Sequence, residues 1–259
     1  MKKTSLILLI LFTFSLSSCS KKELIIVTTT SLENSGLLAY IIPYYEEEFG
    51  VKVKVIAMGT GAALELGELG QADILLVHAY ESEMEFMDAG FGEKRSNIMY
   101  NDFIIVGPEL LNDSTIEEVL NEIKDNHAFY SRGDNSGTHK KELYLWDLYG
   151  FDVSTFGDWY LEAGQGMGST LTMTSLSQYY TLTDRSTYLS MIDNLDLVIS
   201  YENPMELINQ YGVIKVNPEL HNRNDLYADQ FYDWIIRQDT QDLIATYEQY
   251  GEQIFFPNS

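Results

Sequence analysis

Three short segments of the sequence have the side chains and spacing of an anion-binding site. Each joins hydroxyl or glycine residues to the expected start of a helix, and the three are Thr28-Thr29-Thr30-Ser31, Gly59-Thr60-Gly61-Ala62-Ala63 and the stretch 131–139 (SRGDNSGTH). Hydroxyls donate hydrogen bonds, glycines let the backbone approach a ligand, and the first N–H groups of a helix have no partner within it. Because a helix N-terminus also carries partial positive charge, such segments can form a cradle for an oxyanion.

Arg132 is the side chain that distinguishes these segments from ordinary helix caps. Serine and threonine before a helix most often only cap it, so each segment alone is a weak signal. A buried dianion is costly to desolvate unless its oxygens find donors, and an arginine supplies strong, charge-assisted ones. The alternative for Arg132 is a surface salt bridge, which is easy to form in a chain with 39 acidic residues.

Other kinds of chemistry fit the sequence less well. Ser136 and His139 offer a nucleophile and a base for a lipid-anchored hydrolase, but no orienting acid is evident beside them. The glycines at 164, 166 and 168 lack the preceding strand of a dinucleotide site, and the adhesion-like tripeptide at 132–134 (RGD) lies in a loop that feeds a helix. The four histidines are scattered without metal-ligand spacing. We therefore expect no catalytic residue, no metal cation and no cofactor.

The charge balance excludes one class of partner. The chain has 16 basic and 39 acidic residues, a formal net charge of -23, and 45% hydrophobic residues, which is enough for a packed core. Such an acidic surface repels nucleic acid, and it also repels free anions at long range. Any oxyanion site must therefore act through short, directed hydrogen bonds rather than through a broad basic patch.

The first residues have the pattern of a lipoprotein signal peptide. Lys2 and Lys3 precede an apolar run over 6–16, and Leu16-Ser17-Ser18-Cys19 has the form of a lipobox, in which the cysteine is lipidated and becomes the new N-terminus. Cys19 is the only cysteine of the chain. We expect residues 1–19 to be the signal region with its lipobox. The mature body is then lipid-anchored to the cell membrane, facing outside the cytoplasm, with a formal charge of -25.

The apolar pattern of the mature body predicts strands alternating with helices, which is typical of a parallel α/β sheet. Strands are expected at 24–27, 51–57, 73–78, 101–107, 128–131 and 195–200. Helices are expected at 31–49 with a kink at Pro43, and at 62–69, 115–124, 140–148, 156–161, 229–236 and 239–250.

Several stretches of the chain resemble the tungstate-binding proteins of ABC importers, the TupA family. They are Thr28-Thr29-Thr30-Ser31 with Ser35-Gly36-Leu37-Leu38, and the stretches 131–142 (SRGDNSGTHKKE), 180–189 (YTLTDRSTYL), 210–218 (QYGVIKVNP) and 251–257 (GEQIFFP). The resemblance extends over nearly the whole mature chain, and its longest motif, SRGDNSGTHKKE, is quite specific. It implies a type II periplasmic-binding-protein fold, with two α/β lobes, two crossover strands and a ligand cleft between the lobes.

The resemblance also implies lobe boundaries and site residues. Residues 24–104 with 205–259 would form lobe I, and residues 105–204 would form lobe II. The cleft would receive Thr29, Thr30, Ser31, Thr60 and Gly61 from lobe I, and Arg132, Ser136, Gly137 and Thr138 from lobe II. The segment 166–170 (GMGST) resembles a further family segment near the cleft, and from it we expect Thr170 to reach the ligand.

The implied function is that of a monomeric extracytoplasmic solute-binding protein, which captures a tetrahedral oxyanion and delivers it to the permease of an ABC importer. Tungstate is the expected ligand, and molybdate, sulfate and phosphate are the alternatives. The first three carry no proton near neutral pH and suit a cavity of donors. Hydrogen phosphate needs an acceptor, for which Asp134 is the candidate, unless that carboxylate only orders its own loop. A sensor that binds the same anion and signals to a partner is a further class.

Overall fold

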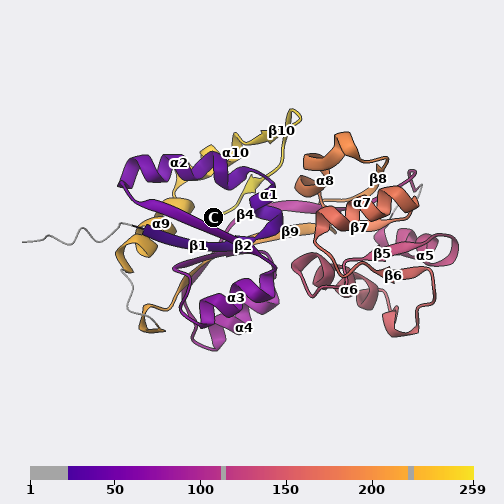
Figure 1. Cartoon of the computed structure of the whole chain (residues 1–259), viewed down its shortest axis with the longest axis horizontal. Coiled ribbons are helices and arrows are strands. Elements are labelled where there is room, and N and C mark those ends of the chain that lie inside the picture. The colour runs from indigo at the N-terminus through magenta and orange to yellow at the C-terminus, as the bar shows by residue number, and fades with distance from the viewer. Residues whose placement is uncertain (1–22, 112–114, 221–224) are drawn as a thin grey trace, which may run out of the picture.

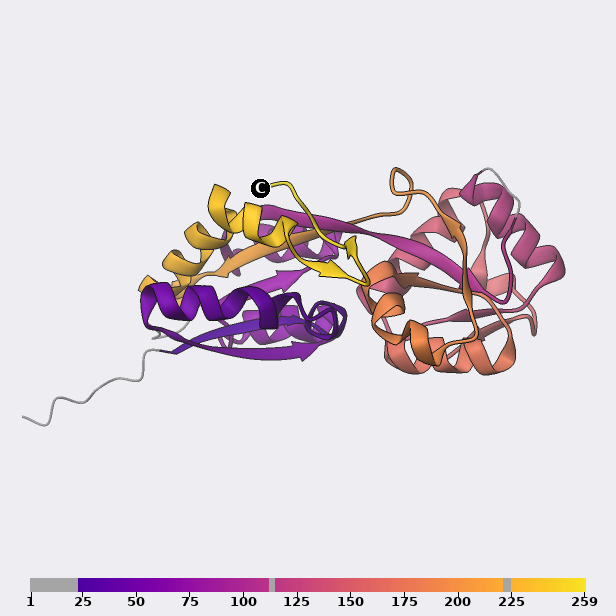
Figure 2. The ribbon, with the colours of Figure 1, turned by 90° about the horizontal axis from the view of Figure 1, so that it is seen from above.

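The computed structural model describes residues 23–111, 115–220 and 225–259. The chain forms two groups of elements joined by long strands, as Figure 2 shows. The expected signal region at 1–19, with Cys19, lies outside the described residues. Within the described part of the chain, no helix is long and apolar enough to span a membrane.

The first group is built on a mixed sheet with the strand order β12-β4-β9-β3-β1-β2. Its strands are β1 (Glu23–Thr29), β2 (Lys52–Met58), β3 (Ile74–Val77), β4 (Gly92–Gly107), β9 (Ile208–Val216) and β12 (Phe256–Pro257). β1 pairs in parallel with β2 and β3, whereas β9 runs antiparallel to both β3 and β4. All four residues of β3 are apolar and buried, so neither face of this strand is exposed to solvent.

Helices cover both faces of this sheet (Figure 1). They are α1 (Thr30–Asn34), α2 (Leu37–Phe49), α3 (Thr60–Glu68), α4 (Tyr80–Asp88), α9 (Asp225–Ile236) and α10 (Gln238–Ala245). Apolar side chains of α2, α9 and α10 form one core on one face, and those of α3 and α4 form a second core on the other. A short 3-10 turn η3 (Pro218–Leu220) and a hairpin of β10 (Glu248–Gln249) and β11 (Glu252–Gln253) complete the group.

The second group surrounds its own core, which is centred on Trp146. Its elements are α5 (Ile116–Asn126), β5 (Phe129–Ser131), α6 (Gly137–Leu148), η1 (Val153–Thr155), β6 (Tyr160–Glu162), α7 (Met167–Ser177), β7 (Thr181–Asp184), α8 (Arg185–Met191), η2 (Ile192–Asn194) and β8 (Val198–Glu202). Five aromatic rings pack edge-on against the fully buried indole: Phe129, Phe151, Phe156, Trp159 and Tyr160. This aromatic core also contains Phe103 and Ile105 of β4, whereas apolar residues of α7 and α8 belong to the core that α2 and α9 form on the first sheet.

The strand β4 belongs to both groups. Its first part pairs with β9, and its last residues pair with β7 and β8. Residues 203–207 then lead the chain back into β9, next to Phe103, whose N–H donates to the carbonyl of Leu207 at 2.7 Å. Asn101 of β4 and Asn209 of β9 are register partners at this junction. The two groups are therefore joined through neighbouring antiparallel strands.

Several expected elements differ from those observed. The single helix expected at 31–49 is two helices, because Gly36 between them has a φ of 79° and the hydroxyl of Tyr247 packs against it; Pro43 lies within α2. The helix expected at 156–161 is wrong, because residues 158–159 form a turn and the chain then enters β6 at Tyr160. The helix expected at 239–250 ends at Ala245, and the sheet is mixed because β9 enters it antiparallel.

Candidate anion-binding site

The three polar segments meet at one small cavity between the two groups of elements. The cavity is lined by Thr29, Thr30, Ser31, Met58, Gly59, Thr60, His78, Arg132, Ser136, Gly137 and Thr138. Helices α1, α3 and α6 all begin at this cavity, so their first N–H groups lie around it. Its volume is about 10 Å³, which is close to the minimum that holds one water molecule.

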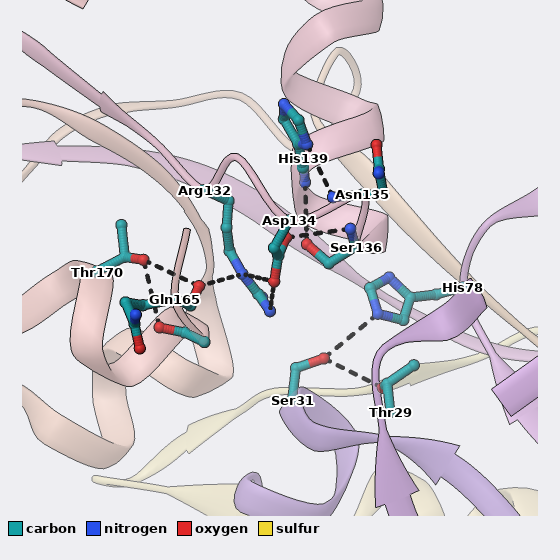
Figure 3. Close-up of polar contacts among 11 residues, drawn as sticks. Thr29, Ser31, His78, Arg132, Asp134, Asn135, Ser136, His139, Gln165 and Thr170 are labelled. Atoms are coloured by element: carbon teal, nitrogen blue, oxygen red, sulfur yellow. Dashed lines mark hydrogen bonds and ion pairs between the residues drawn. The ribbon is translucent and has the colours of Figure 1, made fainter. Parts of the chain in front are cut away.

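On the side of the first group, hydroxyls form a short hydrogen-bonded chain (Figure 3). Thr29 caps α1, where its Oγ1 accepts from the N–H of Leu32 at 3.3 Å. Oγ1 of Thr29 lies 3.1 Å from Oγ of Ser31, and Ser31 Oγ lies 3.3 Å from Nε2 of His78. Thr29, Ser31 and His78 are all buried, so a ligand in this part of the cavity contacts oriented polar groups rather than bulk water.

Thr60 offers a donor that the protein itself does not use. The residue is 1% exposed, and among the described residues its Oγ1 has no hydrogen-bond partner. It lies in the first turn of α3, whose N-cap residue Gly59 provides no side-chain cap. An unpaired buried hydroxyl costs free energy, and it is normally explained by a missing partner such as a water or a ligand.

Arg132 reaches the cavity from the second group and is held by its own loop. Its Nε and Nη2 donate to Oδ2 of Asp134 at 3.1 and 2.7 Å, and Nε also donates to the carbonyl of Gln165 at 3.3 Å. Nη1 takes part in none of these hydrogen bonds with described residues, and the side chain is 6% exposed. A buried guanidinium with a free nitrogen is suited to bind an anion.

Asp134 has both oxygens engaged within the loop. Oδ2 accepts from Arg132, and Oδ1 accepts from the N–H of Ser136 at 3.1 Å. Asp134 is also absent from the lining of the cavity. These contacts favour the interpretation that the carboxylate orders the loop and holds Arg132, rather than accepting a proton from a ligand.

The N-terminus of α6 supplies the remaining donors. Ser136 caps the helix, where its Oγ accepts from the N–H of His139 at 3.3 Å, and Gly137 and Thr138 follow in the first turn. Nδ1 of the His139 ring accepts from the N–H of Asn135 at 3.0 Å, and burial lowers the pKa of the imidazole. The ring is therefore not hydrogen-bonded to the Ser136 hydroxyl, and the serine–histidine pair of a hydrolase is not formed here.

Glu142 anchors the strand end from which Arg132 projects. Its carboxylate accepts from the Ser131 hydroxyl at 2.6 Å, from the indole N–H of Trp146 at 3.0 Å and from the hydroxyl of Tyr160 at 2.6 Å. Burial raises the pKa of Glu142 to about 7, and the three donors oppose this shift. The backbone that carries Arg132 is thereby tied to the aromatic core of the second group.

Eight of the ten residues expected from the sequence line the cavity. Gly61 does not, because it is exposed one residue further along α3. Thr170 does not either; its buried hydroxyl donates to the carbonyls of Gln165 and Gly166 at 3.5 and 3.3 Å, at the start of α7. The cavity also includes His78, Met58 and Gly59, which the sequence did not single out as ligands. Their one common signal is their position at strand ends: His78 directly follows β3, Met58 ends β2 and Gly59 follows it, just as Thr29 ends β1.

The residues present are suited to an anion rather than to a metal cation. Among the described residues, no group of three or more His, Cys, Asp or Glu side chains is placed to hold a metal ion. The cavity lining has no carboxylate and one guanidinium. Together with three helix N-termini, this composition provides hydrogen-bond donors and positive potential.

The sequence of this chain is similar to that of known binding proteins. The chain matches the PBP superfamily domain over residues 17–239. It is 47% identical over 253 residues to the tungstate-binding protein TupA of Peptoclostridium acidaminophilum, which covers 93% of this chain and 87% of that protein. It is 40% identical over 236 residues to the tungstate-binding protein TupA of Campylobacter jejuni, with 87% of each covered.

Solved structures of tungstate-binding proteins are also similar to this chain. The tungstate ABC transporter structure from Geobacter sulfurreducens superposes with a TM-score of 0.80 at 43% identity, covering 87% of this chain and 99% of that one. The tungstate-binding protein TupA of Desulfovibrio alaskensis superposes with a TM-score of 0.79 at 40% identity, covering 92% and 99%. These similarities confirm the expected type II periplasmic-binding-protein fold. The chain therefore belongs to the PBP superfamily and, within it, to the TupA family.

Proposed function

We propose that this chain is the extracytoplasmic solute-binding protein of an ABC importer, and that it captures tungstate and delivers it to a membrane permease. The observation that carries the proposal is the cavity itself, where three helix N-termini, the unpaired hydroxyl of Thr60 and the free Nη1 of Arg132 converge. Each of these groups can donate to an oxyanion, and no carboxylate of the lining competes for them.

The same lining argues for an oxyanion that carries no proton. Tungstate, molybdate and sulfate offer only acceptors near neutral pH, whereas hydrogen phosphate needs a strong acceptor for its own proton. Asp134, the candidate acceptor, is already engaged with Arg132 and Ser136. Among the proton-free anions tungstate is proposed because the similar proteins are named for tungstate. Those proteins belong to a family of binding proteins, and we propose no enzymatic activity for this chain.

The finer assignments are part of the same proposal. Residues 24–104 with 205–259 are assigned to lobe I and residues 105–204 to lobe II, and lipid on Cys19 is proposed to hold the protein at the membrane as a monomer. Direct donors are assigned to Thr29, Thr30, Ser31, Thr60, Arg132, Ser136, Gly137 and Thr138; Gly61, which lies outside the lining, is assigned no contact with the anion. We place Thr170 behind them, because its hydroxyl supports the turn whose Gln165 carbonyl holds Arg132.

Closure of the lobes around the anion is the proposed mechanism. Contacts join the two groups on either side of the cavity: Nζ of Lys140 donates to Ser82 Oγ at 2.7 Å, and the hydroxyl of Tyr250 donates to Asp193 Oδ2 at 3.0 Å. An anion that bridges Ser31 and Arg132 stabilises this closed arrangement, because only the closed form completes its shell of donors.

The proposal is tested by titration calorimetry of the mature body with tungstate, molybdate, sulfate and phosphate in separate experiments. We expect tight binding of tungstate with no detectable heat from phosphate. Tungstate binding should also raise the melting temperature, because the ligand binds only the folded chain. Tight phosphate binding would instead make Asp134 the proton acceptor, and silence from all four anions would contradict the proposed function. Turnover of ester or phosphate substrates that is lost in Ser136→Ala would favour a hydrolase.

A further inference from the structure

A buried chain of polar side chains links the ligand cavity to the strands that join the two groups. The amide nitrogen of Asn209 donates to Oδ1 of Asn101 at 2.7 Å, and Oδ1 of Asn209 lies 2.8 Å from Nδ1 of His78. On the other side of the ring, Nε2 lies 3.3 Å from Oγ of Ser31. All four residues are buried, and the Asn101 and Asn209 positions are opposite each other on β4 and β9.

With the amides of Asn209 and Asn101 oriented as in this chain, the proton of a neutral His78 lies on Nδ1. Because Nδ2 of Asn209 donates to Asn101, Oδ1 of Asn209 is the acceptor that faces His78. Nδ1 of His78 is therefore the donor, and a neutral imidazole has only one N–H. Nε2 is then an acceptor, and the hydroxyl of Ser31 donates to it. Without a ligand, the proton of Ser31 is directed at His78 and is not offered to an anion in the cavity.

An oxyanion without a proton conflicts with that arrangement. It needs donors, so Ser31 must turn its proton from His78 toward the ligand. A neutral His78 would then present a buried lone pair to a hydroxyl oxygen that also has only lone pairs to offer, and one buried polar atom would lose its partner. A second proton on the ring removes the conflict, because Nε2–H donates to Ser31 Oγ while Ser31 donates to the anion.

The charges around the cavity also favour a second proton on His78 when a dianion is bound. Arg132 is the only side chain of the lining with a fixed positive charge, and Asp134 offsets it at 2.7 Å. A dianion beside this pair is left with little compensating charge, and buried uncompensated charge is strongly unfavourable. An imidazolium behind Ser31 supplies one further positive charge within the buried site.

We propose that His78 takes up a proton when a proton-free oxyanion binds, so that the site loads the anion and one proton together. The inference rests on the proposed function and adds a linkage to it. It also assigns His78 the role of a positioning residue, which sets the direction of the Ser31 hydrogen bond and acts on the ligand through that hydroxyl.

The groups that face His78 allow such a change. The carboxylate of Asp184 favours the charged ring, and the guanidinium of Arg132 opposes it; the Tyr211 ring packs at 4.8 Å, and Phe103 lies at 6.4 Å. Burial is the largest influence and lowers the pKa of the free imidazole, so His78 is neutral without ligand near neutral pH. The arriving dianion raises this pKa. At a pH between the pKa of His78 without the anion and its pKa with the anion bound, binding takes up a proton. In that range the affinity for the anion falls as the pH rises.

The proton is counted by titrating tungstate into the mature body at about pH 7.5, one unit above the usual histidine pKa of about 6.5. Buffers of different ionisation enthalpy are compared, because the buffer supplies the proton and its heat is added to the binding heat. We expect uptake of about one proton per tungstate and an affinity that falls about tenfold per pH unit above neutrality. Tight binding with the same heat in every buffer would overturn the inference and leave the proposed function intact; an absence of tungstate binding would overturn the function instead.

Three glutamine variants locate the proton. His78→Gln keeps an amide near the position of Nε2 but cannot become charged, so we expect weaker binding with no proton uptake and no pH dependence. His127→Gln is the matched control, because this histidine pairs with Glu122 away from the cavity and should leave the proton count unchanged. Proton uptake that persists in His78→Gln, or that disappears only in His139→Gln, would contradict the assignment to His78. The buffer dependence of the unaltered protein remains a test even where a variant does not fold.

Discussion

Replacement of Arg132 by alanine is expected to weaken tungstate binding about 30-fold or more. The guanidinium is 6% exposed, it lines the cavity, and its Nη1 takes part in none of the hydrogen bonds to Asp134 and Gln165. Removing one partner of a buried, hydrogen-bonded charge pair costs about 2 kcal/mol or more, because the other charge is left buried without compensation. Titration calorimetry of the unaltered protein and of Arg132→Ala measures the effect.

Arg237→Ala is the matched control for this variant. It removes the same charge from an exposed arginine that pairs with Glu48 and Asp239. If binding depended on the overall field of this acidic chain, both variants would weaken it alike. We expect the tungstate affinity to change by less than about twofold in Arg237→Ala, because surface ion pairs contribute little and exposed charges are screened. Unchanged tungstate affinity in Arg132→Ala would show that the arginine serves only its ion pair with Asp134.

The second large effect is expected from Gly137→Ala, a change of one methyl group. A Cβ on Gly137 would lie 2.8 Å from Cε1 and 3.1 Å from Nδ1 of His78. The ring cannot easily yield, because hydrogen bonds to Ser31 and Asn209 hold both of its nitrogens. Gly137 belongs to the second group of elements and His78 to the first, so the clash holds the cleft partly open. Overpacking of this kind costs about 1–3 kcal/mol, which corresponds to a loss of tungstate affinity of about 5- to 150-fold.

The melting temperature of unliganded Gly137→Ala shows whether weaker tungstate binding comes from the clash or from misfolding. Gly137 lies in the first turn of α6, where alanine is as good as glycine or better for the helix, so the melting temperature should not fall much. Gly61→Ala is the matched control: it makes the same change in the first turn of α3, where a Cβ meets nothing within 4 Å. We expect it to bind tungstate normally. Equal affinities for Gly137→Ala and Gly61→Ala would contradict the proposed closure of Gly137 onto His78.

The strand-to-helix junctions could be predicted because they follow local rules. A run of hydroxyls and glycines after a strand indicates a helix start with free N–H groups, and this holds for Thr29, Thr60 and Ser136. Whether three such junctions come together depends on the topology of the sheet. That topology was inferred from the resemblance to TupA proteins. Thr170 was expected in the cavity because the segment 166–170 resembles a family segment near the cleft, but its hydroxyl lies against its own turn. Local rules do not distinguish such a helix-start hydroxyl that contacts its own turn from one that contacts a ligand.

The rest of the site depends on contacts between distant parts of the chain. His78 follows an apolar strand and is indistinguishable in sequence from a core histidine; only its pairing with Asn209 and Ser31 shows its place. The strand β9 that carries Asn209 was not expected, since its sequence (INQYGVIKV) mixes polar and apolar residues and acquires its burial from β3 and β4. The break in the expected helix at 31–49 likewise reflects Tyr247, which packs on Gly36 from the far end of the chain.

The central claim is that one oxyanion lies between the two groups of elements, within reach of Ser31, Thr60 and Arg132. Diffraction from crystals grown with tungstate, at a wavelength where tungsten scatters anomalously, tests it most directly. We expect one strong anomalous peak in the small cavity, with tungstate oxygens at hydrogen-bonding distance from these three side chains. A peak instead in the neighbouring cavity of about 600 Å³, which is lined by Lys140 and Lys141, would contradict it.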